Sequence, residues 1–249
     1  MLLTMRANIM AGRALSMYAA LQLDVSRFHP DADVREKADK LVALLIPVQK
    51  AYCSDRGFDV CVIGQQVLGG HGYVAEWGLE QNVRDSRIAQ IYEGANGIQA
   101  LDLMGRKTVR SNGELLSVLL QEFDEFIAAA QSSAAMQKYL PHLGASKELI
   151  ADVTRKVIAR AEVNPEEIGA ASYAYMELLG LTLYCFMWQR MLLAAFEKLE
   201  SGQGHAAHLN GLVKTADFFF ARMLPHGKAL AEEIEAGSET MMAMTAEQF

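Results

Sequence analysis

The stretch from Val67 to Gln99 reads VLGGHGYVAEWGLEQNVRDSRIAQIYEGANGIQ and decides how the rest of the chain is interpreted. It contains a glycine cluster, a charged segment at Arg84-Asp85, and then Glu93 before a turn rich in glycine and asparagine. A carboxylate that ends a helical pattern and precedes residues suited to tight turns is oddly placed for a solvated surface charge. The same pattern also fits a helix C-terminus followed by an N-capped helix, so the residues alone leave both interpretations open.

The composition is that of a globular protein with a substantial core. The chain has 249 residues, of which 51% are hydrophobic and 21% charged, so it is not disordered. Its net charge of -7 argues against a nucleic-acid-binding surface. The three cysteines form no CxxC pair, which indicates a reducing, cytoplasmic compartment and gives no support for a metal site.

Two apolar segments raise the question of targeting or membrane insertion. Residues 2–24 form a helical pattern that is apolar nearly all round, with no capping residue before it. The pattern predicts a buried helix rather than a signal peptide, and a chain that opens inside a helix leads us to expect further sequence upstream. The apolar run from Leu178 to Trp188 is too short to span a bilayer, so we expect a core helix and no transmembrane segment.

Helical periodicity dominates the first half of the chain. It predicts helices at about 2–24, 33–54, 59–68, 76–91 and 98–109. The second of these has an apolar stripe formed by Ala38, Leu41, Leu45, Val48 and Tyr52. No stretch alternates with period two, so the fold class predicted is all-α.

A change of composition at Lys107–Gly113 separates a second helical region. Beyond it, apolar faces recur at helical spacing: Leu116, Leu119, Phe123, Phe126 and Ala130; Ile150, Val153, Val157 and Ala161; Leu212, Ala216, Phe219 and Phe220. Asn164 and Pro165 predict the start of a long helix. We therefore expect two domains, 1–110 and 111–249, of which the second is a helical bundle of its own.

Familiar short motifs do not identify a cofactor or metal site in this sequence. Gly70-His71-Gly72 begins like a dinucleotide fingerprint but has no third glycine and no preceding strand. His205 and His208 have a spacing that suits a metal, but no third ligand accompanies them, so we interpret them as surface or capping residues.

The combination of three blocks is far more specific. Residues 66–73 (QVLGGHGY), 84–88 (RDSRI) and 90–94 (QIYEG) resemble, in order and spacing, the C-terminal α-helical domain of the acyl-CoA dehydrogenases. The resemblance covers residues 1 to about 110. The remaining chain resembles an extra helical domain of a bacterial subfamily that includes methylthiopropanoyl-CoA dehydrogenases. Because such enzymes begin with a helical domain and a β-domain that this sequence lacks, we expect the chain to be the C-terminal portion of one.

The resemblance implies a role for Glu93. In this family the glutamate of the Tyr-Glu-Gly block removes the α-proton of an acyl-CoA thioester while a hydride leaves Cβ for FAD. Its backbone N–H and a flavin hydroxyl stabilise the charge on the thioester carbonyl. The resemblance also implies that Gly94 contacts substrate, since glycine leaves room for acyl-CoA over the turn.

The resemblance also implies cofactor and partner contacts. Residues 66–70 correspond to a segment that reaches a neighbouring subunit's FAD, and residues 95–97 lie beside the same cofactor, so the predicted cofactor-binding residues are Gln66, Val67, Leu68, Gly69, Gly70, Ala95, Asn96 and Gly97. Ala95 stands where a threonine is common in the family and Ala100 where an arginine is common, so only main-chain contacts are expected there. Arg84 and Asp85 are interpreted as structural, as an ion pair that fixes the loop. Electron-transfer flavoprotein as acceptor and a homo-oligomeric assembly are further implications. The alternative is a catalytically inert helical oligomerisation module when this polypeptide is isolated.

Overall fold

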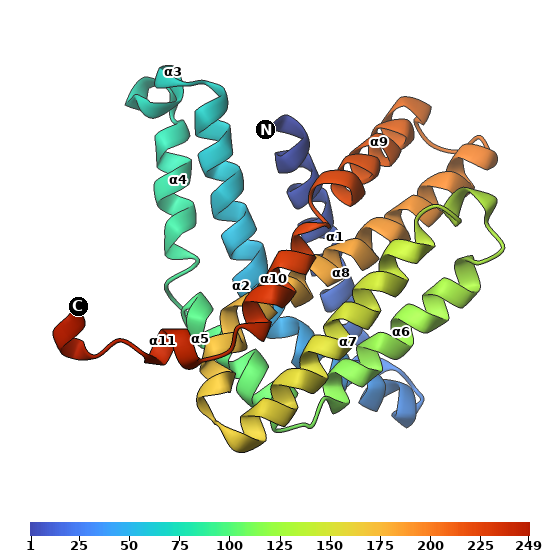
Figure 1. Ribbon diagram of the computed structural model, residues 1–249. Helices are drawn as coiled ribbons and strands as arrows, with labels where there is room; N and C mark the ends of the chain where they lie inside the picture. Colours follow the sequence, from blue (N-terminus) through green and yellow to red (C-terminus); the bar gives the residue numbers. More distant parts are fainter.

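The computed structural model describes all residues from 1 to 249 and contains helices and no strand (Figure 1). The prediction of an all-α fold is confirmed. The helices, in chain order, are α1 (Leu2–Phe28), α2 (Ala32–Val67), α3 (Gly70–Tyr73), η1 (Ala75–Trp77), α4 (Leu79–Ile88), α5 (Asn96–Leu101), η2 (Asp102–Val109), α6 (Glu114–Ala130), η3 (Ala134–Met136), α7 (Leu140–Val163), α8 (Glu166–Glu200), α9 (Ala206–Arg222), α10 (His226–Glu235), α11 (Glu239–Met242) and η4 (Ala246–Gln248).

Helix α1 packs against α2 along one stripe only. Its buried side chains Ala7, Ala11, Leu15 and Tyr18 follow helical spacing, which places them on one face. The prediction that this helix is buried all round is wrong, because several apolar side chains on its other face are exposed: Leu2, Leu3, Ile9, Met17 and Leu21.

Helix α2 is one continuous element, not the two helices predicted at 33–54 and 59–68. It begins after Asp31, whose carboxylate accepts a hydrogen bond from the Asp33 N–H at 2.9 Å. Two polar residues in the predicted gap, Asp55 and Arg56, both find partners on other helices. A polar interruption therefore does not have to reach solvent through a loop, and the helix continues.

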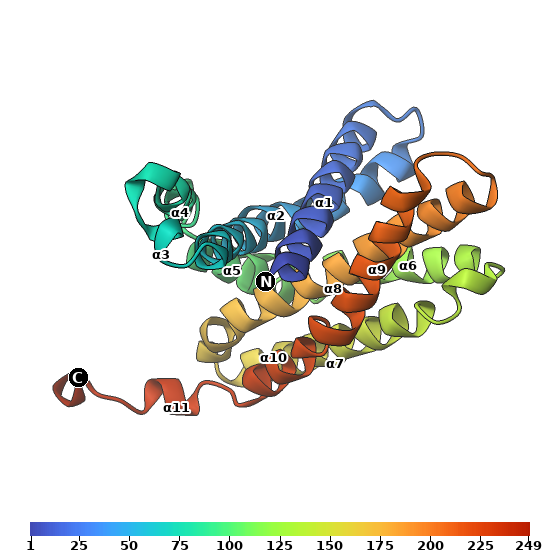
Figure 2. The ribbon, with the colours of Figure 1, turned by 90° about the horizontal axis from the view of Figure 1, so that it is seen from above.

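A helical hairpin projects from the rest of the molecule. It consists of the C-terminal part of α2 with α3, η1 and α4, and it stands apart from α8 in both views (Figures 1 and 2). At the turn, a Cβ on Gly72 would lie 2.1 Å from the Gln65 carbonyl oxygen, so only glycine fits there. Helix α4 is shorter than the predicted 76–91, because Gly78 with φ +71 separates it from η1.

Helix α8 is the centre of the molecule. It packs against α7, α9 and α10 of its own half and also against α1, α2 and α5 (Figure 2). Part of it is long and apolar enough to cross a membrane, but 78% of that part is buried by the neighbouring helices. This agrees with the prediction of a core helix. The Asn164 side chain accepts a hydrogen bond from the Glu166 N–H at 3.1 Å, as expected of a capping residue.

The predicted apolar faces form the core. All residues predicted on the α2, α7 and α9 faces are buried, and on α6 only Phe126 is half-buried. Nearly all the buried hydrophobic side chains belong to one cluster of 47 residues that includes members from both halves; Ala38 and Ala161 of the predicted faces lie outside it. The division at residue 110 stays a prediction about sequence organisation, while packing is continuous across it.

Candidate functional site

Glu93 lies in the loop between α4 and α5, on backbone that side chains rarely adopt. Its φ is +55 and that of Gly94 is +82, so two successive residues are left-handed and the chain reverses sharply. For a residue other than glycine this conformation costs energy and is concentrated at functional sites. The Glu93 side chain is exposed, and neither the Glu93 nor the Gly94 N–H donates a backbone hydrogen bond within the chain. The loop thus presents a carboxylate and free N–H groups together.

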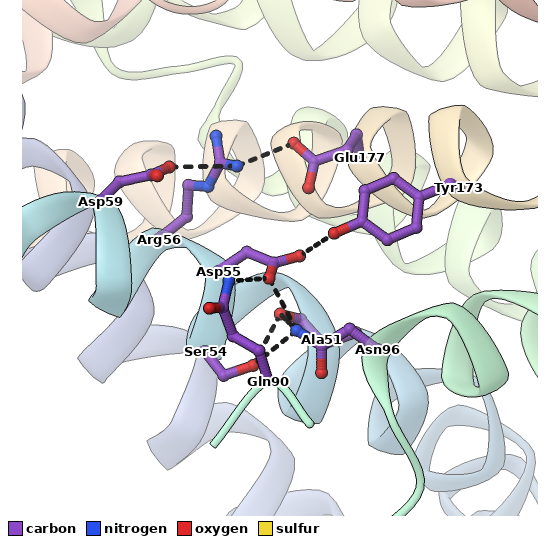
Figure 3. A network of polar contacts seen from close by, with 9 residues as sticks. All are labelled: Ala51, Ser54, Asp55, Arg56, Asp59, Gln90, Asn96, Tyr173 and Glu177. Atoms are coloured by element: carbon purple, nitrogen blue, oxygen red, sulfur yellow. Dashed lines mark hydrogen bonds and ion pairs between the residues drawn. The ribbon is translucent and has the colours of Figure 1, made fainter. Parts of the chain in front are cut away.

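Asn96 closes this loop and ties it to α2. Its N–H donates to the Gln90 carbonyl oxygen at 2.9 Å. Its buried side-chain amide lies 2.8 Å from the Ser54 hydroxyl and 2.7 Å from Asp55 Oδ1 (Figure 3). The Lys50 ammonium donates to Asn96 Oδ1 at 2.7 Å. The N–H and the side chain of Asn96, a predicted cofactor-binding residue, therefore form hydrogen bonds within the chain.

Asp55 is the buried acceptor on which these contacts converge. Besides Asn96, the Gln90 side-chain amide donates to its Oδ1 at 2.5 Å, and the Tyr173 hydroxyl of α8 donates to its Oδ2 at 2.5 Å (Figure 3). Asp55 was not among the residues singled out from the sequence. A signal existed, because Asp55 follows Ala51 and Tyr52 at the i+4 and i+3 spacing of a buried helix face.

An ion-pair cluster continues the network. The Arg56 guanidinium lies 3.2 Å from both the Asp59 and the Glu177 carboxylates (Figure 3). Burial raises the pKa of Glu177 to about 7, and the negative charges of Asp55 and Asp59 add to this rise although Arg56 opposes it. The cluster joins α2 to α8 at Arg56, the residue next to Asp55.

The glycine-rich segment of residues 66–70 lies at the far end of α4 from Glu93 (Figure 1). Helix α4 has ten residues, so the two places are separated by about 15 Å of helix. All five residues of the segment are exposed, and no atom lies within 4 Å of a Cβ built on Gly69 or Gly70. One chain therefore does not bring this segment and Glu93 to the same point.

The other residues singled out from the sequence lie in different surroundings. Gly97 is exposed with open space around it, and Ala95 is half-buried. The predicted ion pair between Arg84 and Asp85 is wrong: Asp85 accepts from the Gln81 amide at 2.7 Å, because neighbouring helical residues point apart while residues four apart meet.

The two histidines serve the start of α9. His205 Nδ1 accepts from the His208 N–H at 3.3 Å, which agrees with the capping interpretation. No group of three or more metal-ligating side chains occurs anywhere in the chain.

A hollow of about 830 Å³ lies on the projecting hairpin, between α2 and α4. Its lining combines apolar and cationic side chains and includes Phe58, Tyr73, Arg84, Arg87 and Ile91. The hollow ends near the loop that carries Glu93.

Comparison with known proteins gives matches along almost the whole chain. Residues 1–107 match the family model described as acyl-CoA dehydrogenase, C-terminal domain, and residues 119–245 match the model described as acetyl-CoA dehydrogenase C-terminal like. A 3-methylmercaptopropionyl-CoA dehydrogenase of Ruegeria pomeroyi is 34% identical over 90% of the chain and 38% of its own length. A butyryl-CoA dehydrogenase of Syntrophomonas wolfei is 27% identical over 100% of the chain and 41% of its own length. A broad-specificity linear acyl-CoA dehydrogenase of Mycobacterium tuberculosis is 26% identical over 98% and 41%. The chain thus spans about two fifths of the length of these curated relatives.

Proposed function

The chain belongs to the acyl-CoA dehydrogenase family, and we propose that it forms the C-terminal portion of an FAD-dependent member that introduces an α,β double bond into an acyl-CoA thioester. Glu93 is the catalytic base of this proposal. The observation that carries it is the loop itself, where a left-handed turn presents the Glu93 carboxylate outward beside an unused N–H.

The proposed reaction requires a base and a hydrogen-bond donor, and the Glu93 loop supplies both. The α-proton of a thioester is only weakly acidic, so its removal requires a base within hydrogen-bond reach and a donor that stabilises the charge developing on the carbonyl oxygen. The Glu93 carboxylate takes the proton, and the Glu93 N–H, free within the chain, donates to the thioester oxygen. Gly94 adds no side chain over the path of the acyl group. Both functions come from one turn, so the conformation of that turn controls both.

The residues present fit a partial contribution to FAD binding. FAD, when bound, accepts the hydride that leaves the substrate Cβ. Ala95 and Gly97 neighbour the base, and open space at Gly97 allows close approach of a cofactor to the main chain. The exposed segment 66–70 would hold the adenosine diphosphate end of a second FAD, that of a neighbouring subunit. The length of α4 supports this assignment, because it separates the segment from Glu93 within one chain.

Replacement of the base tests the proposal. In the flavin-loaded dehydrogenase that contains this chain, Glu93→Gln should lower the rate of flavin bleaching by acyl-CoA about 10²–10⁴-fold, because an amide cannot accept the proton. Flavin content should stay unchanged, since the side chain points away from the folded core. The measurement is single-turnover absorbance at the flavin band.

A matched control is Glu162→Gln, which removes the same charge from an exposed glutamate of α7. It should bleach at the rate of the unmodified protein. Bleaching of the Glu93→Gln protein at that same rate would remove Glu93 from its role.

Partners follow from the same proposal. The exposed apolar face of α1, with Leu2, Met17 and Leu21, favours burial against another copy or another part of the enzyme, so we infer a homo-oligomer. This face also favours the alternative function, an inert oligomerisation module, for the isolated polypeptide. Electron-transfer flavoprotein as acceptor and a cytoplasmic location complete the proposal.

A further inference from the structure

The loop that carries Glu93 is held at both ends by one oxygen atom. Gln90 begins the loop and Asn96 ends it, and the Asn96 N–H joins them through the Gln90 carbonyl. The side-chain amides of both residues donate to Asp55 Oδ1, at 2.5 and 2.7 Å (Figure 3). Any displacement of this oxygen therefore moves both ends of the loop together.

The other oxygen of Asp55 is held from the second half of the chain. Tyr173 lies on α8, 118 positions further along, and its hydroxyl donates to Asp55 Oδ2 at 2.5 Å. No other side chain donates to Oδ2, so Tyr173 alone orients that side of the carboxylate. The residues matched by the second family model begin at 119, and Tyr173 is among them.

The Tyr173–Asp55 hydrogen bond is not needed merely to hold α8 against α2. The Arg56–Glu177 ion pair and the Tyr52 ring packed on Gly180 already join the two helices. Glu93, by contrast, sits on left-handed backbone, which persists only where the surrounding structure enforces it. Lys50 and Ser54 also contact Asn96, but only Asp55 accepts from the side chains at both ends of that loop.

We propose, on the basis of the proposed function of Glu93, that Asp55 and Tyr173 are positioning residues: the Tyr173 hydroxyl fixes the Asp55 carboxylate, which fixes the loop that presents the base. The second helical module thereby takes part in catalysis in the first, through a hydrogen bond beneath the active-site turn.

The first arm of the test measures the loop in this chain without cofactor. Tyr173→Phe removes the hydroxyl and keeps the ring, and should raise the hydrogen–deuterium exchange rate of the Asn96 N–H about tenfold. The matched control is Tyr175→Phe on the same helix, which removes a buried hydroxyl that contacts Thr154 at 2.8 Å, away from the loop. It should leave exchange at Asn96 unchanged, even if it lowers the melting temperature more.

The second arm measures chemistry in the flavin-loaded protein. Tyr173→Phe should lower the rate constant of flavin reduction about 10- to 100-fold, because small misplacements of a reacting group are costly. Its flavin content and its dissociation constant for acyl-CoA should remain within twofold of the unmodified protein. Tyr175→Phe should leave the rate constant unchanged. A merely structural role for Tyr173 would change stability without this split between rate and binding.

The two arms distinguish failure of the further inference from failure of the proposed function. Unchanged exchange at Asn96 in Tyr173→Phe overturns the anchoring, whatever Glu93 does. Faster exchange with an unchanged rate constant overturns the positioning role. Full activity of Glu93→Gln overturns the proposed function, and the Tyr173–Asp55 hydrogen bond then has no role in catalysis. The exchange rate at Asn96 still shows whether that hydrogen bond holds the loop.

Discussion

Glu177 shows how a single side chain in this network acquires unusual behaviour. It lies on α8 with little exposure, and its partner Arg56 is shared with Asp59. Removal from water disfavours the charged form of a carboxyl, and neighbouring carboxylates disfavour it further. These effects exceed the attraction of Arg56, so the pKa of Glu177 rises to about 7.

This rise predicts a pH dependence of stability. In the unfolded chain Glu177 ionises near its ordinary pKa of about 4.3, whereas the folded protein holds the proton until about pH 7. Unfolding therefore releases a proton between these values, and the free energy of unfolding falls as pH rises through that window, by no more than about 4 kcal/mol. Glu177→Gln, neutral throughout, should lose this part of the slope.

The measurement is urea unfolding of both proteins from pH 4.5 to 7.5. The slopes are compared rather than the absolute values, because glutamine also replaces the carboxyl group that contacts Arg56. Parallel curves for the two proteins would contradict a raised pKa at Glu177.

At the scale of one element, α8 combines roles that its composition alone does not separate. Its apolar middle packs the core, and its N-terminal part carries Tyr173 and Glu177 to the network on α2. Helix α8 approaches α2 closely at Gly180, where a Cβ would lie 2.3 Å from the Tyr52 ring. The ring has little room to move, because Tyr52 is buried and packs edge-on against Tyr184.

Gly180→Ala should therefore destabilise the protein by about 1–3 kcal/mol through overpacking. Gly169→Ala is the control on the same helix, since nothing lies within 4 Å of its Cβ position. That variant should be neutral or gain about 0.5–1 kcal/mol from alanine's higher helix propensity. Urea midpoints of both variants give the comparison, and equal midpoints would show that α8 does not meet the Tyr52 ring closely.

At the scale of the whole molecule, the continuity of the core is the main feature. Buried residues of α1 and α2 belong to the same cluster as those of α6 to α10. Helix α8 contributes to both sides, with twenty buried residues. Helices that share one core lose their packing together, so the two halves should unfold cooperatively.

A destabilising mutation in the first half of the chain should then also lower the unfolding midpoint of the second half. Leu44 of α2 and Trp188 of α8 are both fully buried. In a Trp77→Phe background, Leu44→Ala should lower the unfolding midpoint followed by Trp188 fluorescence as much as the midpoint followed by circular dichroism, for a cost of about 2–5 kcal/mol. A Trp188 midpoint that stays unchanged, after a separate early loss of helix, would contradict cooperative unfolding.

Much of this protein was determined by its sequence alone. Apolar residues at helical spacing predicted the all-α fold and the buried faces of α2, α7 and α9, because amphipathic periodicity is a property of neighbouring positions. The spacing of the glycine cluster, Arg84-Asp85 and Glu93 was sufficient to predict the family. Turn chemistry likewise predicted a turn at Glu93, although the helix before it ends at Ile88 and not at the predicted residue 91.

Only the tertiary structure decided where helices continue and what holds the Glu93 loop. The break predicted within α2 was wrong because Asp55 and Arg56, which lie in the predicted gap, find their partners on other helices. Asp55 meets Asn96 across 41 positions and Tyr173 across 118. No local pattern encodes such partners: a buried carboxylate is tolerated only when donors reach it, and here the packing of α8 on α2 brings them there.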